Sequence, residues 1–242
     1  MVNKEKILGI NVSVTSYDSL KNNIINDIKF NNKSFIVAIN PEKILKAKKD
    51  SNLKKLLNSA TYQIPDGVGV VLASKIKKGK IQSRVTGIDT MEMICKLSND
   101  NGYKVFMYGA KEKTVLKAKE VLEIRYPKIK IVGFVDGYEK NDEKIITAIN
   151  KSGADIIFVA LGSPKQEEWI ENHMEKLNVK IFQGVGGSFD VISGNIKRAP
   201  KWMQKCGLEW LYRLIKEPKR IIRQIKLLKF LFIVFFDKKE EV

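Results

Sequence analysis

The sequence predicts an α/β fold: a mostly parallel, Rossmann-like sheet with helices on both faces, plus a basic helical C-terminal appendage. Short apolar and β-branched runs alternate with helical segments, which is typical of a parallel sheet covered on both faces. Small residues follow several of these runs, where strands would end and ligands would bind. From about Lys197 the alternation stops, and the chain becomes basic and rich in aromatic residues.

The expected elements follow in order. Each strand is an apolar or β-branched run, and each helix has amphipathic spacing. A Pro or Gly marks most of the junctions, as expected where one element ends and the next begins. The strand runs, with their turns, are 33–40, 61–67, 102–110, 128–138, 154–164 and 179–190, and the helices are 41–60, 111–126, 141–153 and 164–177.

Length and charge divide the chain in two. Its 242 residues suffice for one sizeable Rossmann-like domain, which we place at residues 1–196, with the appendage at 197–242. The formal net charge is +17, and the stretch from Lys197 to Lys229 holds 11 Lys and Arg against two acids. Such an excess predicts an anionic partner, for which nucleic acid, acidic lipid and a nucleotide diphosphate are all candidates.

The appendage predicts two or three helices, broken near Gly207 and at Pro218. Its aromatic and cationic residues suit an interfacial helix on an anionic membrane, although a helical cap packed on the domain is the alternative, and both can hold together. A helix bent only slightly at Pro218 would align four cations in a stripe that grips phosphates or lipid headgroups, unless they form a solvated face. These cations are Arg213, Lys216, Arg220 and Arg223.

Composition also excludes some classes. Two separate cysteines and one histidine are too few for a structural zinc site. The first residues lack the apolar core of a signal peptide, and no apolar run reaches the length of a spanning helix. No Asp-x-Asp pair occurs, the usual metal-holding pair of sugar-nucleotide enzymes. We therefore expect a cytoplasmic protein that uses no metal and no cofactor.

Three turns in the predicted sheet carry small residues directly after a strand. They contain Gly109-Ala110, Gly162-Ser163-Pro164 and Gly184-Val185-Gly186-Gly187. Small residues let a diphosphate approach backbone N–H groups, although any one glycine is explained as well by a tight turn. Three such turns in one sheet favour a nucleotide site.

Asp66, Asn40, Arg84 and Gln166 are candidates for chemistry, and each also has a structural explanation. Asp66 lies in a strand-to-helix turn, where Pro-Asp-Gly is a common composition. Ser163 and Gln166 match a capping box at a helix start, and Asn40 suits a strand end or a helix cap. Arg84 lies on a connection where an arginine is either solvated or reaches toward an anion.

Taken together, these stretches resemble the WecG/TagA/CpsF glycosyltransferases, glycosyltransferase family 26. The resemblance covers nearly the whole chain in order, and the last segment is most similar to the TagA branch, which makes the linkage unit of wall teichoic acid. The segments that carry it are ILGINVSVTSYDSL, INPEK, IPDGVGV, SRVTGID, FMYGA, VGFVDGY, DIIFVALGSPKQEEW, GVGGSFDVISG and RAPKWMQKCGLEWLYRLIKEPKRIIR.

The resemblance implies an inverting transfer of N-acetylmannosamine from a UDP-sugar donor to the 4-hydroxyl of N-acetylglucosamine on undecaprenyl diphosphate, a polyprenyl-diphosphate-linked acceptor. It implies that Asp66 is the general base. Contacts to the sugar or diphosphate are implied for Asn40, Arg84, Gln166, Gly109, Gly162 and Gly187, and a ribose or base contact for Asp190.

The appendage of this family is thought to close over the active site at the membrane, through arginines that match Arg213, Arg220 and Arg223. A cytoplasmic protein held peripherally on the inner face of the cell membrane is therefore expected, and homo-oligomer formation stays open. One position departs from the family: Ala38 stands where a Thr is frequent.

Other functions are compatible with parts of the same sequence. The same fold could use UDP-glucose or a UDP-mannosaminuronic acid for capsule or surface polysaccharide synthesis. The basic tail could instead bind nucleic acid, but no recognition helix or RNA-binding signature accompanies it, so no nucleic-acid partner is expected. A pure membrane tether would leave the glycine-rich strand ends unexplained.

Overall fold

The computed structural model describes residues 2–200, 202–203, 206, 209–216 and 221–237. Its strands are β1 (Lys4–Ile7), β2 (Ile10–Ser13), β3 (Ser34–Ile39), β4 (Tyr62–Pro65), β5 (Lys104–Gly109), β6 (Lys130–Val135), β7 (Ile156–Ala160) and β8 (Ile181–Gly184). Its helices are α1 (Tyr17–Lys29), α2 (Pro41–Ala47), α3 (Ser51–Ser59), α4 (Val68–Ile76), α5 (Gly87–Asn101), α6 (Glu112–Arg125), α7 (Asp142–Ser152), α8 (Lys165–His173), α9 (Ser188–Ile192), α11 (Glu209–Lys216) and α12 (Ile221–Phe236), and a 3-10 helix, η1 (Met174–Lys176), follows α8.

Six strands form one parallel sheet in the order β4-β3-β8-β7-β5-β6. Neighbouring residues of β3 point to opposite faces, so that Phe35 and Val37 join one apolar core and Ile36 joins the other. Runs that are apolar on both faces are typical of a parallel sheet. The predicted α/β fold with a parallel sheet is confirmed.

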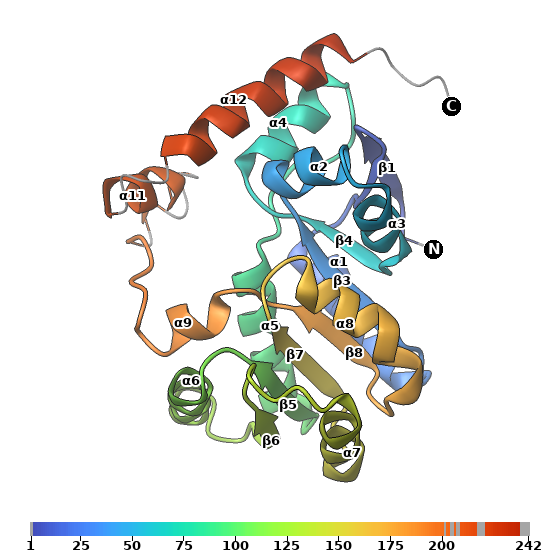
Figure 1. The fold of residues 1–242 in the computed structure, drawn as a ribbon, viewed down its shortest axis with the longest axis vertical. Coiled ribbons are helices and arrows are strands. Elements are labelled where there is room, and N and C mark those ends of the chain that lie inside the picture. Colours follow the sequence, from blue (N-terminus) through green and yellow to red (C-terminus); the bar gives the residue numbers. More distant parts are fainter. Residues whose placement is uncertain (1, 201, 204–205, 207–208, 217–220, 238–242) are drawn as a thin grey trace.

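Helices cover both faces of this sheet (Figure 1). One core cluster packs α2, α3, α7 and α8 against one face, and the second packs α1, α5, α6 and α9 against the other. The helices that follow β3, β4, β7 and β8 all begin near the carboxyl ends of their strands. This edge of the sheet is where a ligand is expected.

An antiparallel hairpin, β1–β2, precedes the sheet. Its turn residues, Leu8 and Gly9, both have positive φ, at 50° and 78°, as in the tight turns that join two strands. Ser13 Oγ accepts a hydrogen bond of 3.0 Å from the backbone N–H of Gln63 in β4. The hairpin therefore covers the outer edge of β4, which would otherwise be an open edge strand.

Two predicted elements divide in the structure. The helix expected at 41–60 is two helices, because Asp50 caps α3 by accepting a hydrogen bond of 3.0 Å from the backbone N–H of Leu53. The apolar run 179–190 also divides, since β8 ends at Gly184 and α9 begins at Ser188. The intervening turn gives the carboxyl edge of the sheet its glycine-rich loop.

The C-terminal helix α12 packs on α2 and α4 and shares one of the two apolar cores of the α/β fold. Phe230 and Val234 are fully buried in the first core cluster. A Cβ on Gly69 of α4 would lie 2.5 Å from Leu227 Cδ1 and 2.6 Å from Pro41 Cγ, so that a larger residue would require these side chains to shift. The helical-cap alternative therefore describes α12. The expected breaks near Gly207 and at Pro218 both fall outside the described residues.

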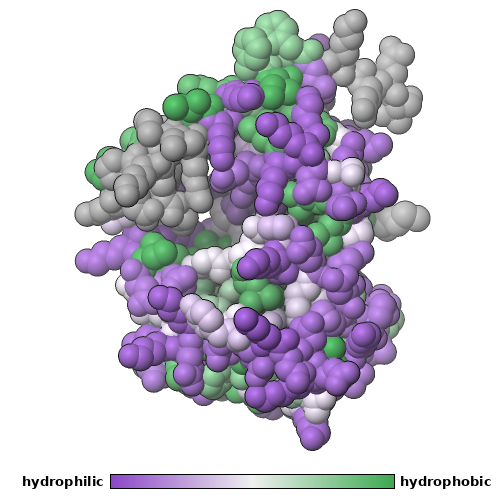
Figure 2. Space-filling model, viewed as in Figure 1, coloured by the Kyte–Doolittle hydropathy of each residue, from purple (hydrophilic) through white to green (hydrophobic). Residues whose placement is uncertain are grey.

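The outer face of α12 is apolar and exposed. Ile225, Leu228, Phe232, Phe235 and Phe236 are each between 61% and 70% exposed. Figure 2 shows apolar residues in green at the end of the molecule where α12 lies. Within the described ranges, no helix has both the length and the apolarity to cross a membrane.

Candidate functional site

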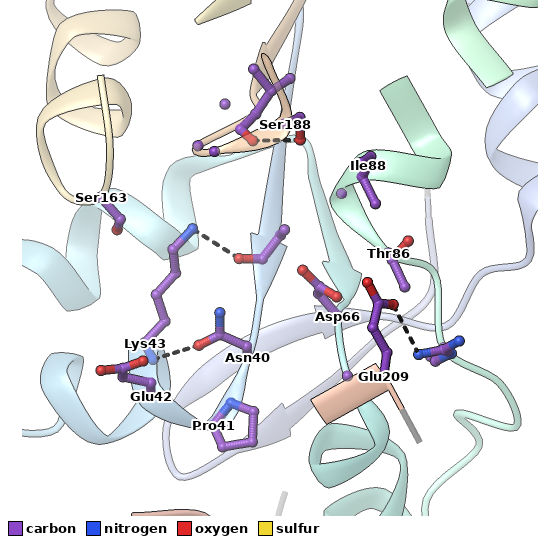
Figure 3. A pocket seen from close by; sticks show the side chains of 18 of the residues that line it. Asn40, Pro41, Glu42, Lys43, Asp66, Thr86, Ile88, Ser163, Ser188 and Glu209 are labelled. Carbon is purple, nitrogen blue, oxygen red and sulfur yellow. Dashed lines mark hydrogen bonds and ion pairs between the residues drawn. The ribbon is translucent and has the colours of Figure 1, made fainter. Parts of the chain in front are cut away.

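A cavity of about 590 Å³ lies at the carboxyl ends of β3, β4 and β8. The fold brings together residues from seven separate segments around it, and Figure 3 shows Asn40, Asp66 and Glu209 bordering the same space. Five of the residues to which the family resemblance assigns a role line it, namely Asn40, Asp66, Arg84, Gln166 and Gly187.

Asp66 follows the last residue of β4 and is partly exposed to the cavity. Its backbone N–H donates to the carbonyl of Ile39 at 2.8 Å, and Gly67 leaves the strand with a φ of +99°. A Cβ on Gly87, the first residue of α5, would lie 3.9 Å from Asp66 Oδ2 and 3.4 Å from Ala38 Cβ. The carboxylate therefore lies near a helix N-terminus, which favours negative charge.

Asn40 caps α2. Its Oδ1 accepts a hydrogen bond of 2.9 Å from the backbone N–H of Lys43, and Pro41 occupies the first turn. Its amide NH₂ has no hydrogen-bond partner among the described residues, and Asn40 lines the cavity. The capping role and a ligand contact are therefore compatible, because the two ends of the amide serve different partners.

A buried polar network forms one wall of the cavity. Lys43 Nζ donates to the carbonyl of Ala38 at 2.9 Å and to Glu167 Oε1 at 2.7 Å. Gln166 Nε2 donates to the same Glu167 oxygen at 3.0 Å, and Gln166 Oε1 accepts from the backbone N–H of Gly186 at 3.0 Å. The network ties α2 and α8 to the loop after β8.

The start of α8 differs from the predicted capping box. The helix begins at Lys165, with Pro164 at the N-cap position and no side-chain cap, and Ser163 lines the cavity instead. The Gln166 side chain turns inward because Glu167 and Gly186 occupy both ends of its amide. The prediction that Ser163 and Gln166 cap this helix is wrong.

Arg84 lies on the loop before α5, as predicted, at the edge of the cavity. Its Nη1 is 4.0 Å from Oε2 of Glu209 in α11, and Glu209 Oε1 is 3.4 Å from Arg198 Nε. Glu209 is nearly buried, at 9% exposed. This carboxylate links α11 to two arginines of the chain before it.

A second ion pair lies behind Arg84. Arg198 Nη1 is 2.6 Å from Asp89 Oδ1, and Thr86 Oγ1 donates to Asp89 Oδ2 at 2.6 Å. Burial raises the pKa of Asp89, but the hydrogen bonds from Arg198 and Thr86 outweigh burial, so this pKa lies below its ordinary value. The pair holds the first turn of α5, next to Asp66.

The glycines predicted to contact a ligand differ in their surroundings. A Cβ on Gly162, Gly186 or Gly187 would meet nothing within 4 Å, so these turns leave open space. Gly109 is different, because its Cβ would lie 2.5 Å from the carbonyl oxygen of Ala160 in the adjacent strand. Close contact between strands, together with a φ of +110°, explains glycine at that position.

A second cavity of about 500 Å³ lies at the carboxyl ends of β5 and β7. Asp190 lines this cavity and not the first. Asn195 Nδ2 donates to Thr114 Oγ1 at 3.1 Å and lies 3.5 Å from Asp190 Oδ1. Burial, followed by the charges of nearby carboxylates, raises the pKa of Tyr108 in the same wall to about 12. A neutral phenol therefore faces this cavity.

The appendage reaches the first cavity through α12. Lys226 and Leu227 line it, and Lys226 Nζ is 3.3 Å from Glu42 Oε1. Arg220 lies outside the described residues, and of Arg213 and Arg223 only the backbone is described, in α11 and α12. Nowhere among the described residues do three or more His, Cys, Asp or Glu side chains form a group that could hold a metal ion.

Several charged residues of this site were not among the candidates predicted from the sequence. Lys43 is one of many lysines, and nothing in its helix distinguishes it. Glu167 did carry a signal, because it shares helical spacing with Ile170 and so falls on the apolar face of α8. Asp89 and Arg198 pair across a long sequence separation that no local pattern reveals.

Comparison with known proteins adds to this geometry. The model of the glycosyl transferase WecG/TagA/CpsF family matches residues 5–241. An N-acetylglucosaminyldiphosphoundecaprenol N-acetyl-beta-D-mannosaminyltransferase of Bacillus subtilis is 36% identical over 233 residues, which cover 96% of this chain and 90% of that protein. A protein of the same description from Bacillus spizizenii is 37% identical over 204 residues, covering 84% of this chain and 79% of that protein.

Proposed function

The chain belongs to the WecG/TagA/CpsF glycosyltransferase family, and from this premise we propose that it transfers N-acetylmannosamine from UDP to the 4-hydroxyl of undecaprenyl-diphosphate-linked N-acetylglucosamine. The two Bacillus relatives are named for N-acetylmannosaminyl transfer to an acceptor of this kind. One observation carries the proposal: Asp66, Asn40, Arg84 and Gln166 line a single cavity at the carboxyl edge of the sheet. The product would be the linkage unit of wall teichoic acid.

Asp66 is the general base of the proposed reaction. The acceptor O4 attacks C1 of the donor sugar, the C1–O bond to UDP breaks, and the acceptor proton passes to the Asp66 carboxylate. One displacement inverts the configuration at C1, so that one carboxylate suffices. The partly exposed position of Asp66 on the cavity supports this role.

Backbone amides and arginines stabilise the departing diphosphate. The open space beside Gly162, Gly186 and Gly187 supports a close approach of phosphate to the backbone. Arg84 supplies positive charge at the cavity edge, and we assign Arg213, Arg220 and Arg223 of the appendage to the same task. With these groups in place, the proposed transfer uses no divalent metal.

The uridine of the donor lies in the second cavity. The segments at 161–165 and 190–196 border both cavities, so that one ligand can extend from the first to the second. Asp190 and Asn195 there offer a carboxylate and an amide to ribose or base. This arrangement leaves the sugar end of the donor beside Asp66.

The exposed apolar face of α12 rests on the membrane that holds the acceptor. Five large apolar side chains on one helix exceed what a soluble surface needs, and the surrounding cations suit anionic lipid. We therefore assign the protein to the inner face of the cell membrane as a peripheral protein.

The test is product identification. The full chain is mixed with UDP-N-acetylmannosamine and a detergent-dispersed polyprenyl-diphosphate N-acetylglucosamine, with and without EDTA. We expect release of UDP and a disaccharide joined to the 4-hydroxyl by an inverted linkage, at the same rate in EDTA. Mass spectrometry and NMR of the released glycan identify the product.

Donor competition separates this reaction from its alternatives. UDP-glucose and UDP-N-acetylmannosaminuronic acid are offered together with UDP-N-acetylmannosamine. Preferential transfer of either alternative would replace the proposed donor, and loss of activity in EDTA that Mg²⁺ or Mn²⁺ restores would remove the metal-free mechanism.

A further inference from the structure

Lys43 and Glu167 form an ion pair that is almost removed from solvent. Their side chains are 11% and 0% exposed, and Lys43 Nζ and Glu167 Oε1 are 2.7 Å apart. Glu167 Oε2 is buried without a hydrogen-bond partner among the described residues. Only one carboxylate oxygen is therefore used, and it accepts from both Lys43 and Gln166.

This arrangement determines how the Gln166 amide is oriented. A carboxylate only accepts hydrogen bonds and a backbone N–H only donates. Gln166 Nε2 must therefore face Glu167, and Gln166 Oε1 must face Gly186, as the structure has them at 3.0 Å each. A Cβ on Gly184 would lie 2.7 Å from Gln166 Nε2, so the glycine at this position leaves room for the amide.

Stability alone does not account for such a pair. Replacing a buried ion pair by apolar side chains of similar volume is often neutral or stabilising, because burial of the two charges removes their hydration. An apolar side chain at position 167 would, however, leave Gln166 Nε2 without its acceptor. What the pair supplies is a fixed orientation of Gln166, and through it a fixed N–H of Gly186.

We infer that Lys43 and Glu167 are positioning residues for the donor: their ion pair holds Gln166, and Gln166 holds the Gly186 turn in the shape that receives the diphosphate. The inference rests on the proposed function, since it takes that turn to bind UDP. The pair acts through Gln166 and need not touch the donor. It therefore affects donor binding and leaves acceptor binding unchanged.

Matched substitutions in the full chain test the inference. Lys43→Met and Glu167→Gln break the pair, whereas Lys46→Met and Glu171→Gln make the same changes at exposed positions of the same helices. We expect the first two to weaken UDP binding at least tenfold in calorimetry and to raise the donor KM similarly. The acceptor KM and both control variants stay within twofold of the unmodified chain.

The double variant Lys43→Met, Glu167→Gln separates positioning from stability. It removes both charges, so we expect its Tm to return to that of the controls while UDP binding stays weak and amide exchange of Gly186 stays fast. Recovery of both Tm and UDP binding in the double variant would overturn the inference. If Lys43→Met does not fold, Glu167→Gln decides, because it keeps the shape of the side chain.

The outcomes also distinguish this inference from the proposed function. If the unmodified chain fails to bind UDP, the proposed function falls. If it binds UDP and the Glu167→Gln variant binds equally well, the positioning role falls and the proposed function stands.

Discussion

Asp66 and Asp136 each precede a glycine at the end of a parallel strand, but only Asp66 lines the first cavity. Asp66→Asn keeps the shape of the side chain and removes the base. We expect kcat to fall by roughly 10²–10⁴-fold, the usual contribution of a general base, while UDP binding measured by calorimetry stays within twofold.

Asp136→Asn is the matched control for this prediction. Asp136 Oδ1 accepts a hydrogen bond of 2.7 Å from the backbone N–H of Tyr138, and its charge helps to raise the pKa of Tyr108, but Asp136 does not line the first cavity. Its substitution should leave kcat unchanged. If Asp66→Asn transfers sugar at the normal rate, or merely unfolds, then Asp66 serves the turn and not the chemistry.

The ion pair between Asp89 and Arg198 should make the thermal stability of the protein depend on pH. Its pKa is depressed in the folded protein, so its contribution to stability is present above about pH 4, the ordinary pKa of Asp, and is lost as pH falls through the folded value. Asp89→Asn should therefore lower Tm by a few degrees at pH 7 and by much less near pH 3. Calorimetric scans of both proteins measure this, and an equal difference at both pH values would contradict it.

The sequence predicts those site residues that belong to a recognisable local motif. Asn40, Asp66 and Gly187 stand at strand ends, where elementary rules place ligands, and all three line the cavity. The partners of Lys43 and Arg198 cannot be predicted this way, because Glu167 and Asp89 meet them only after the sheet has formed. Tertiary packing, and not sequence spacing, creates these pairs.

Among the elements, α12 has two apolar faces with different roles. Phe230 and Val234 face the core, and Phe232 and Phe236 face outward, 66% and 64% exposed. Substituting both outward residues by Ser should weaken binding to anionic lipid vesicles at least tenfold, because each phenylalanine contributes about 1.5–3 kcal/mol when fully buried. Tm should not change. Vesicle sedimentation measures the binding.

Phe30→Ser is the control for this change. Phe30 is 66% exposed at the end of α1, so the variant removes the same side chain at the same exposure from another surface. Vesicle binding that falls equally in both proteins, or in neither, would show that α12 does not form the membrane surface.

Some helices and strands can be predicted from the sequence, and others cannot. The six strands of the sheet and the helices α6, α7 and α8 are confirmed because their hydrophobic spacing is strong, whereas α1, α4, α5 and the β1–β2 hairpin were not predicted. The break between α2 and α3 depends on the cap made by Asp50, which the periodicity of 41–60 obscures. The packing of α12 on Gly69 could not be predicted, since it joins segments far apart in the chain.

For the whole molecule, the shared core limits what truncation can preserve. A chain ending at Ile196 loses the burial of Phe230 and Val234 and the contact of Glu209 with Arg84. We expect it to fold with a lower Tm, because Phe-to-Ala changes in a core alone cost about 3–5 kcal/mol. Transfer should be nearly abolished. Calorimetry and the product assay measure both effects, and full activity in this chain would remove any role of the appendage.

The position of α12 affects how a lipid-linked substrate would reach the first cavity. Lys226 and Leu227 line the first cavity, while their neighbours Ile225 and Leu228 face outward, so one helix about 10–12 Å across separates the two environments. A substrate of the proposed kind can react while its hydrocarbon chain stays in the bilayer, and encounters then occur by lateral diffusion. Diluting the acceptor with inert detergent at constant bulk concentration should lower the rate in proportion to its surface mole fraction.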